Sequence, residues 1–375
     1  MKKIVVVLEH RFYQFEGRLY TKLAFSYEYW KSYLTYFDEV EILARVQAID
    51  HWDSSMRLVD GAGVSFIPMP YYRGIRGFVK NLPKLLATAW RVGRTRERFL
   101  LRSGNVTNII WPILILLRRP YLREYPGNVR EGIRGFAGDS ILVRAISSIS
   151  HGLALLQGKT SRANSYVSQY CREIYPSKRP GFVFSSFSLE EIGSSLASPN
   201  TDGNFVLVSV GRLEGEKGHS VLLRSLADPR LRGVTLNLVG DGGLLDELKK
   251  SVVGGSVKFH GAIADREKLF EIVRASHLFV IPSLTEGMPR ALLEAMALGL
   301  PCIGSRVGGI PEILEDGCMF TPGNSLELSE LIVELMRNSG LRNRVAQRNL
   351  SFVRENFNAQ IVEQRKHAFW SKIYD

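Results

Sequence analysis

The sequence predicts an α/β protein built from two doubly wound domains that face a central cleft. With 375 residues, the chain is longer than a typical single hydrophobic core supports. Its second half alternates short apolar runs with helical patterns, and its first half does so more loosely. Strands that alternate with helices are typical of parallel sheets covered by helices on both faces. We therefore expect a first domain over residues 1–195 and a second over residues 201–355.

In the first half, six short runs are expected to be strands. A helix-like stretch, 20–34, follows the first of them. The polar stretch 185–204, rich in Ser, Pro and Gly, is interpreted as the linker between the domains. The expected strands are 3–9, 40–46, 64–70, 98–103, 120–125 and 161–166.

In the second half, five apolar runs end in glycine-rich or polar turns. Ligands of parallel α/β sheets bind beyond the carboxyl ends of the strands, which is where these turns lie. The expected strands are 204–210, 234–240, 257–261, 278–283 and 301–305.

Cysteine usage and hydropathy indicate a protein of the cytosol or of the cytoplasmic face of a membrane. The cysteines Cys171, Cys302 and Cys318 lie far apart, without the spacing of metal ligands. The apolar run near the N-terminus is too short for a signal peptide, and the run 109–117 is shorter than the roughly 20 residues that span a bilayer.

The net charge of +12 lies entirely in the first half. Residues 1–200 hold 28 Lys and Arg against 16 Asp and Glu, whereas residues 201–375 hold 21 of each. The stretch 71–100 interleaves basic and aromatic or aliphatic residues, so we expect it to meet an anionic membrane surface. A solvated basic helix packed on its own domain is the alternative. Nucleic acid is not expected as a partner because no recognition motif accompanies the charge.

Two glutamates, Glu286 and Glu294, lie eight residues apart around a predicted helix start. Pro289 suits the first position of that helix, so the backbone amides of Gly287 and Met288 would be free to bind an anion. Carboxylates repel phosphate but accept hydrogen bonds from sugar hydroxyls. A nucleotide sugar offers both groups, with a diphosphate between two sugars. Arg212 and Lys217, after an earlier strand, would supply the cations for the diphosphate.

These motifs resemble the C-terminal domain of retaining family 4 glycosyltransferases, which have the GT-B fold of two Rossmann-like domains. The matching stretches are 209–218, 238–248, 257–263 and 281–314, and the pair Glu286 and Glu294 matches the family's E-x7-E motif. Residues 356–375 are similar to the family's final helix, which crosses back onto the first domain.

The resemblance implies a role for each matching residue. Arg212 and Lys217 would neutralise the donor diphosphate and the leaving phosphate. Glu294 would bind the ribose, and Glu286 would face the transferred sugar. The amides of Gly287 and Met288 would contact sugar and phosphate. Ile263 would line the base.

In the first domain the resemblance is weaker. Gly17 is a candidate for close approach to the donor phosphate, although an ordinary turn glycine explains it equally well. Family members often carry a histidine where this chain has Tyr125 and Pro126. His10 is a candidate for contact with sugar or acceptor. Further acceptor candidates, Arg102, Ser103 and Asn128, end predicted strands or follow them.

The sequence thus predicts a retaining hexosyltransferase that uses a UDP-sugar or GDP-sugar and a glycan or lipid-linked saccharide acceptor. It is expected to build a surface polysaccharide or glycoconjugate and to need neither metal nor cofactor, since the chain has no D-x-D sequence. Two alternatives stay open: a nucleotide-sugar epimerase of similar fold, and a non-catalytic basic module that binds membrane or nucleotide.

Overall fold

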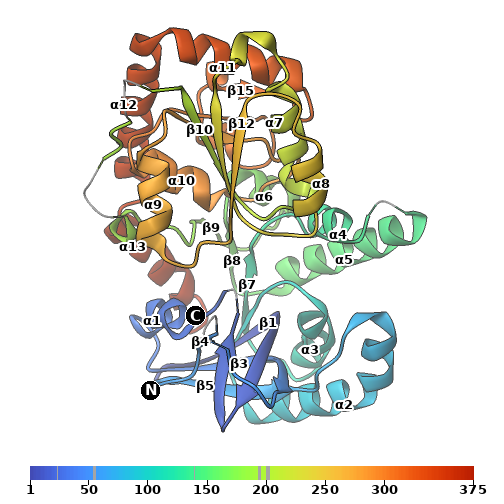
Figure 1. Ribbon diagram of the computed structural model, residues 1–375. Coiled ribbons are helices and arrows are strands. Elements are labelled where there is room, and N and C mark those ends of the chain that lie inside the picture. The colour runs from blue at the N-terminus through green and yellow to red at the C-terminus, as the bar shows by residue number, and fades with distance from the viewer. Residues whose placement is uncertain (23, 54–55, 139, 193–195, 200–202) are drawn as a thin grey trace.

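The computed structural model describes residues 1–22, 24–53, 56–138, 140–192, 196–199 and 203–375. These residues form two α/β domains stacked end to end, one around each of two largely parallel sheets (Figure 1). This arrangement is the one that the predicted GT-B fold class requires.

The first sheet has strand order β5-β3-β1-β6-β7-β8-β9, and these strands are parallel. The far end of β1 pairs with β2, which pairs with β4, and both of these pairings are antiparallel. The strands are β1 (Lys3–Phe15), β2 (Arg18–Thr21), β3 (Glu39–Ala48), β4 (Arg57–Leu58), β5 (Val64–Met69), β6 (Phe99–Leu101), β7 (Tyr121–Tyr125), β8 (Asn164–Tyr166) and β9 (Gly181–Val183).

The start of the first domain differs from the sequence prediction. β1 continues to Phe15 and turns back into β2, so the helix expected over 20–34 is only α1 (Tyr27–Leu34). Glu16 and Gly17 both have positive φ, 45° and 78°, as the two central residues of a tight hairpin turn require. The alternation in this stretch of polar and aromatic residues suits a two-stranded ribbon, which the helical interpretation missed.

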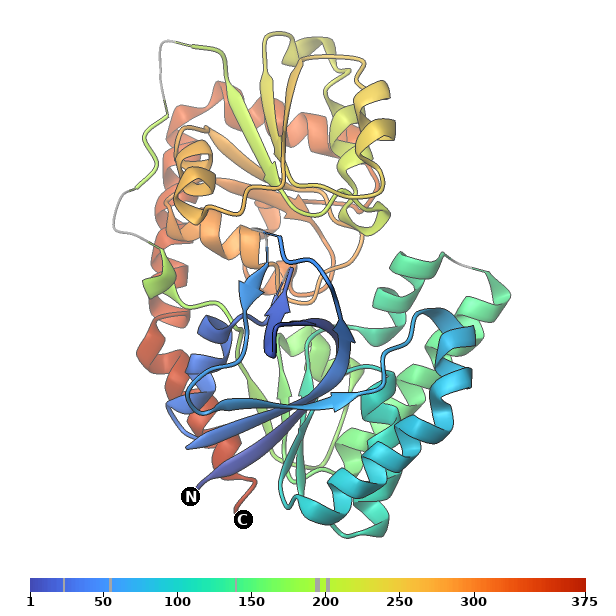
Figure 2. The same cartoon turned by 60° about the horizontal axis from the view of Figure 1, so that its bottom comes forward.

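Two helix layers cover the first sheet. Ile4, Val6 and Leu8 of β1 pack on one face with α1 and α13 (Ala359–Ser371), whereas Val5 and Val7 pack on the other with α2 and α3. α13 follows the second domain in sequence, yet it lies beside α1 in both views (Figures 1 and 2). The other helices of this domain are α2 (Gly74–Thr95), α3 (Asn105–Leu116), α4 (Val129–Ala137), α5 (Ile141–Thr160) and α6 (Gln169–Ile174).

The second sheet is parallel, with order β12-β11-β10-β13-β14-β15. The order reverses between β10 and β13, so a crevice for ligands opens beyond the carboxyl ends of these two strands. The elements are β10 (Val206–Val210), β11 (Thr235–Val239), β12 (Ser256–Gly261), β13 (Leu278–Ile281), β14 (Cys302–Ser305) and β15 (Met319–Phe320), with α7 (His219–Ser225), α8 (Leu245–Lys250), α9 (Arg266–Arg274), α10 (Arg290–Ala297), α11 (Ser325–Arg337) and α12 (Ser339–Asn356).

Candidate functional site

An ion pair links the two loops that leave the switch-point strands. Lys217 ends the short turn η2 (Gly215–Lys217) after β10, and its Nζ lies 2.7 Å from Oε1 of Glu286, in the loop after β13. The Ser283 hydroxyl donates to the same oxygen over 2.7 Å. Both charged side chains are largely buried. The structure therefore brings together two of the predicted donor residues, at the N-terminal side of α10.

Close backbone contacts fix the loop that carries Glu286. A Cβ on Gly308, whose φ is 55°, would lie 1.7 Å from the carbonyl oxygen of Glu286. A Cβ on Gly218 would lie 2.0 Å from the carbonyl oxygen of Pro282. No side chain fits at these distances, so both glycines are needed for the loops to meet.

The second glutamate, Glu294, lies two turns into α10 and is held by two arginines. Its Oε1 accepts from Arg266 Nη2 and from Arg290 Nε, each at 3.0 Å. Sequence reasoning missed both arginines. The spacing of four residues between Arg290 and Glu294 could have suggested their pairing, whereas Arg266 comes from α9 and left no local signal.

Arg212 lies at the rim of this site. Its guanidinium donates to Glu216 over 2.8 Å, and its side chain is 64% exposed. Behind it, His219 is buried, and burial lowers the pKa of His219 to about 4. Arg212 thus lies in the same loop as Lys217 but pairs with a different carboxylate in this structure.

The first domain directly contacts the loop that carries Glu286. Gly287 packs against Pro126 and Gly127 at the end of β7, where an added Cβ would lie 3.0 Å from the Pro126 carbonyl oxygen. From α4, Glu131 accepts hydrogen bonds from the hydroxyls of Thr285 and Tyr170. The carboxylate of Glu131 therefore joins the first domain to the residue that precedes Glu286.

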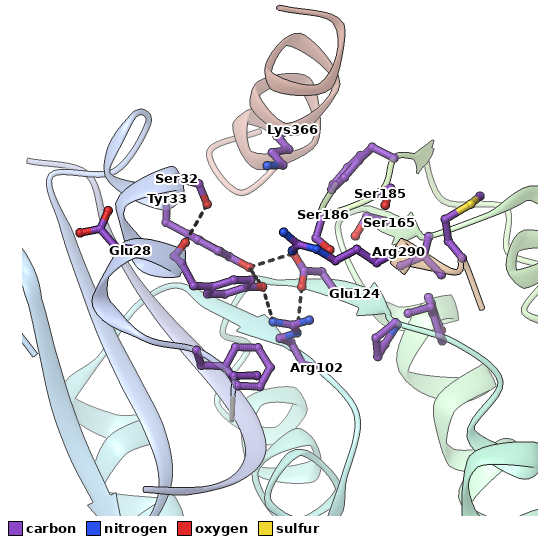
Figure 3. Close-up of a pocket in the computed structure, with 18 of the residues that line it drawn as sticks. Glu28, Ser32, Tyr33, Arg102, Glu124, Ser165, Ser185, Ser186, Arg290 and Lys366 are labelled. Carbon is purple, nitrogen blue, oxygen red and sulfur yellow. Dashed lines mark hydrogen bonds and ion pairs between the residues drawn. The ribbon is translucent and has the colours of Figure 1, made fainter. Parts of the chain in front are cut away.

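A pocket of about 740 Å³ lies between the domains (Figure 3). Its polar lining includes serine hydroxyls from β8 and the segment after β9, such as Ser165 and Ser185. The second domain and the crossing helix contribute Met288, Arg290 and Lys366. Its charged lining residues are Glu28, Arg57, Arg102, Glu124, Arg266, Arg290 and Lys366, which is five cations against two carboxylates.

One wall of this pocket is a buried ion pair (Figure 3). Arg102 Nε lies 3.1 Å from Glu124 Oε2, and Arg102 also donates to the Tyr29 hydroxyl over 2.5 Å. Tyr33 donates to Glu124 over 3.3 Å. Burial, and then the charge of Glu124, raises the pKa of Tyr33.

The other predicted residues lie outside this pocket, as far as its described lining shows. His10 bonds Thr21 over 3.0 Å, and burial followed by the charge of Arg45 lowers the pKa of His10 to about 4. Asn128 caps α4 by accepting from two backbone amides. Gly17 is at the hairpin tip, Ser103 follows β6, and Ile263 packs against the core of the second domain.

No metal centre is evident in the described residues, where no three His, Cys, Asp or Glu side chains are grouped to hold an ion.

Known proteins resemble this chain in sequence and in fold. Residues 204–338 match the family model described as "Glycosyl transferases group 1". Protein CapJ of Staphylococcus aureus is 26% identical over 326 residues, which are 84% of this chain and 81% of CapJ. N-acetyl-alpha-D-glucosaminyl L-malate synthase of Bacillus anthracis is 31% identical, but over only 37% of this chain and 38% of its own length.

Solved structures cover the whole chain. Sucrose-phosphate synthase from Thermosynechococcus elongatus aligns with a TM-score of 0.72 at 16% identity, over 100% of this chain and 99% of its own. HepE of Anabaena, solved with UDP and glucose, aligns with a TM-score of 0.71 at 17% identity, over 99% of this chain and 100% of its own. At such identities the likeness concerns the fold. The chain therefore has the GT-B fold, and its residues 204–338 are similar to the glycosyl transferases group 1 family.

Proposed function

We propose that the chain is a retaining glycosyltransferase that moves a hexose from a nucleoside-diphosphate sugar to a hydroxyl of a glycan or lipid-linked saccharide. The observation that carries this proposal is the pairing of Lys217 with Glu286 at the start of α10, across from the first domain. A cation suited to a diphosphate and a carboxylate suited to sugar hydroxyls meet there. The E-x7-E spacing and the matched family domain support the same assignment.

In this proposal each group at the site has a separate role. Lys217 and Arg212 bind the diphosphate, and Glu294 accepts hydrogen bonds from the ribose. Glu286, already oriented by Ser283 and Lys217, faces the transferred sugar. The amides of Gly287 and Met288 add donors at the positive end of the helix.

The proposed chemistry is attack by the acceptor hydroxyl on the same face that the diphosphate leaves. The leaving phosphate takes the proton, so that no protein base is required. Arg212 and Lys217 stabilise the negative charge that grows on that phosphate, which is the contribution we propose in place of a metal ion. Since the pKa of His10 is about 4, this histidine is neutral at pH 7 and does not serve as a cation for the phosphate.

We place the acceptor in the interdomain pocket. Its lining carries five cations and two carboxylates together with serine hydroxyls, groups that can bind the hydroxyls of a saccharide and a phosphate or diphosphate group. A lipid diphosphate-linked saccharide has that chemistry, and residues 71–100 would bring the enzyme to the cytoplasmic membrane face where such an acceptor resides. Structural relatives include the lipopolysaccharide outer core galactosyltransferase WaaB, which supports a surface glycan as the product class.

The test is thermal unfolding of the purified protein with UDP, GDP, ADP and CMP. We expect one nucleotide to raise Tm, with UDP the first candidate because HepE binds it. The variant Arg212→Ala/Lys217→Ala should lose the shift. Arg224→Ala/Lys249→Ala, which removes two exposed cations from α7 and α8, is the matched control and should keep it.

Each alternative predicts a different result. No shift of Tm with any nucleotide at millimolar concentration would contradict the proposal and favour the non-catalytic module. An isomerised donor without transfer to an acceptor would identify an epimerase. Hydrolysis or transfer with inverted anomeric configuration, read by NMR of the product, would overturn the retaining assignment alone.

A further inference from the structure

Large hydrophobic side chains are exposed mainly on one helix layer of the first domain. Of the eighteen exposed large hydrophobic residues in the described chain, ten lie on α2, α3 and α5. These helices cover the same face of the first sheet and lie together on the side opposite α1 and α13 (Figures 1 and 2). The ten residues are Ile75, Val79, Leu86, Trp90, Ile115, Leu116, Ile141, Leu142, Ile149 and Leu156.

On α2 the exposed side chains form a stripe. Ile75, Val79, Leu86 and Trp90 are spaced by four, seven and four residues, which at 3.6 residues per turn places them within about 60° of each other. Ile75 and Val79 are 66% and 60% exposed. The basic side chains of α2 follow the same stripe along one flank, displaced by about a quarter to half a turn. They are Arg76, Lys80, Lys84, Arg91 and Arg94.

The charge of this layer has one sign. α2, α3 and α5 contain seven Lys and Arg, five on α2 and two on α5, and no Asp or Glu in their full lengths. A soluble surface ordinarily mixes both signs and avoids apolar stripes. Apolar side chains flanked by cations are what a helix needs to lie in the interface of an anionic bilayer.

α5 adds a second apolar stripe to this layer. Leu142, Ile149 and Leu156 are spaced by seven residues, and the first two are 64% and 65% exposed. By length and composition α5 is the one described helix that could cross a membrane. However, its C-terminal half is held on the sheet, since the hydroxyls of Tyr121 and Tyr125 donate to the carbonyls of Gln157 and Ala154.

We propose that the outer surface of α2, α3 and α5 docks on an anionic bilayer, with Leu142 and Ile149 of α5 entering the acyl region and the basic side chains of α2 meeting lipid headgroups. The inference rests on the proposed function for its purpose, because such docking would hold the acceptor pocket at the membrane. It extends the expected contact from residues 71–100 to a helix that sequence reasoning did not assign. A second copy of the chain is a poorer occupant, since two such surfaces would repel each other.

The first experiment measures co-sedimentation with vesicles of phosphatidylcholine containing 30% phosphatidylglycerol, and with pure phosphatidylcholine vesicles. Wild type should bind the anionic vesicles, and salt should weaken the binding. Leu142→Ser/Ile149→Ser should lower the vesicle affinity about tenfold or more, because two apolar side chains leave the acyl region. Leu326→Ser, at an exposed leucine of α11, is the control and should bind as wild type.

A label reports insertion directly. The three native cysteines are buried, so single variants Ile149→Cys and Leu326→Cys can be labelled selectively with a polarity-sensitive fluorophore. The emission of the label at position 149 should shift to the blue with anionic vesicles, and that at 326 should not. Equal behaviour of both labels, or unchanged vesicle affinity of Leu142→Ser/Ile149→Ser, would overturn the proposal.

Two further measurements distinguish membrane docking from self-association, and failure of the docking proposal from failure of the proposed function. If Leu142→Ser/Ile149→Ser converts a dimer to a monomer in sedimentation velocity without changing vesicle binding, the layer is a self-interface and the lipid proposal fails. The nucleotide-induced Tm shift of the same variant should equal that of wild type. For wild type, a nucleotide-induced Tm shift without vesicle binding refutes the docking surface and leaves the proposed function intact. Vesicle binding of wild type without any nucleotide shift does the reverse.

Discussion

The two domains share an architecture but differ in how their helices meet solvent. In the second domain, α7 to α12 expose one large hydrophobic residue among those described, Leu326, and residues 201–375 balance their charges. In the first domain three helices carry ten such residues and no acid. The candidate site residues of the second domain therefore lie in loops at the switch point. The unusual feature of the first domain is instead the outer surface of three helices, which is apolar and basic. The same architecture can therefore carry two proposed functions, donor binding and membrane docking, because loops and helix surfaces vary independently of the sheet.

The largest expected effect tests whether the first domain depends on its buried ion pair. Arg102→Ala leaves Glu124 buried without its cation, so the free energy of unfolding should fall by about 3 to 5 kcal/mol. Urea denaturation measures this loss. Lys3→Ala, at the exposed pair with Glu39, is the control and should change stability by about 0.5 kcal/mol or less. A loss of unfolding free energy of similar size in both variants would show that the stability of the first domain does not depend on the buried pair in particular.

The next test concerns turnover in the second domain. Glu286→Gln keeps the shape of the side chain but removes the charge beside Lys217, and we expect kcat to fall on the order of 10²–10³-fold, as for loss of an oriented transition-state group. The nucleotide-induced Tm shift should largely persist. Full transferase activity in this variant would contradict the role given to Glu286.

A smaller effect is expected for Glu294, which we assign to binding rather than turnover. Glu294→Ala removes hydrogen bonds to ribose, so donor affinity should fall by about 1.5 to 3 kcal/mol. Isothermal titration with the stabilising nucleotide measures it. The variant also frees Arg266 and Arg290 from their shared carboxylate, so Glu294→Gln is the companion that keeps the side-chain volume. If both variants bind nucleotide as wild type does, the ribose assignment is wrong.

The smallest effect compares the buried His219 of the second domain with the partly buried His10 of the first. Burial lowers the folded-state pKa of His219 and of His10 from 6.5 to about 4, so protonation favours the unfolded state. Their stabilisation is present above pH 6.5 and is lost as pH falls toward 4; for His219 the loss between pH 6.5 and 5 is about 2 kcal/mol. His219→Gln should flatten the stability profile in this window. An unchanged slope in both His219→Gln and His10→Gln would contradict the lowered pKa values.

The second domain was more predictable than the first for a physical reason. Its strands end in turns rich in Gly, Pro, Arg and Glu, so candidate donor residues could be proposed from short stretches such as 283–294. Arg266 and Glu131 reach the site only through tertiary packing. No local sequence pattern could therefore predict their place in it. In the first domain, His10 bonds Thr21 and Asn128 caps the first turn of α4. These structural contacts explain both residues without any contact to a substrate.

The crossing helix α13 has a consequence for synthesis on the ribosome. Phe369, Trp370 and Ile373 complete the core that Ile4, Val6 and Trp30 begin, although the whole second domain separates them in the chain. A nascent first domain therefore stays without part of its core until residues beyond 369 have left the exit tunnel. The usual N-terminal-first order of domain maturation is reversed. The second domain can finish folding while the first still waits for its final helix.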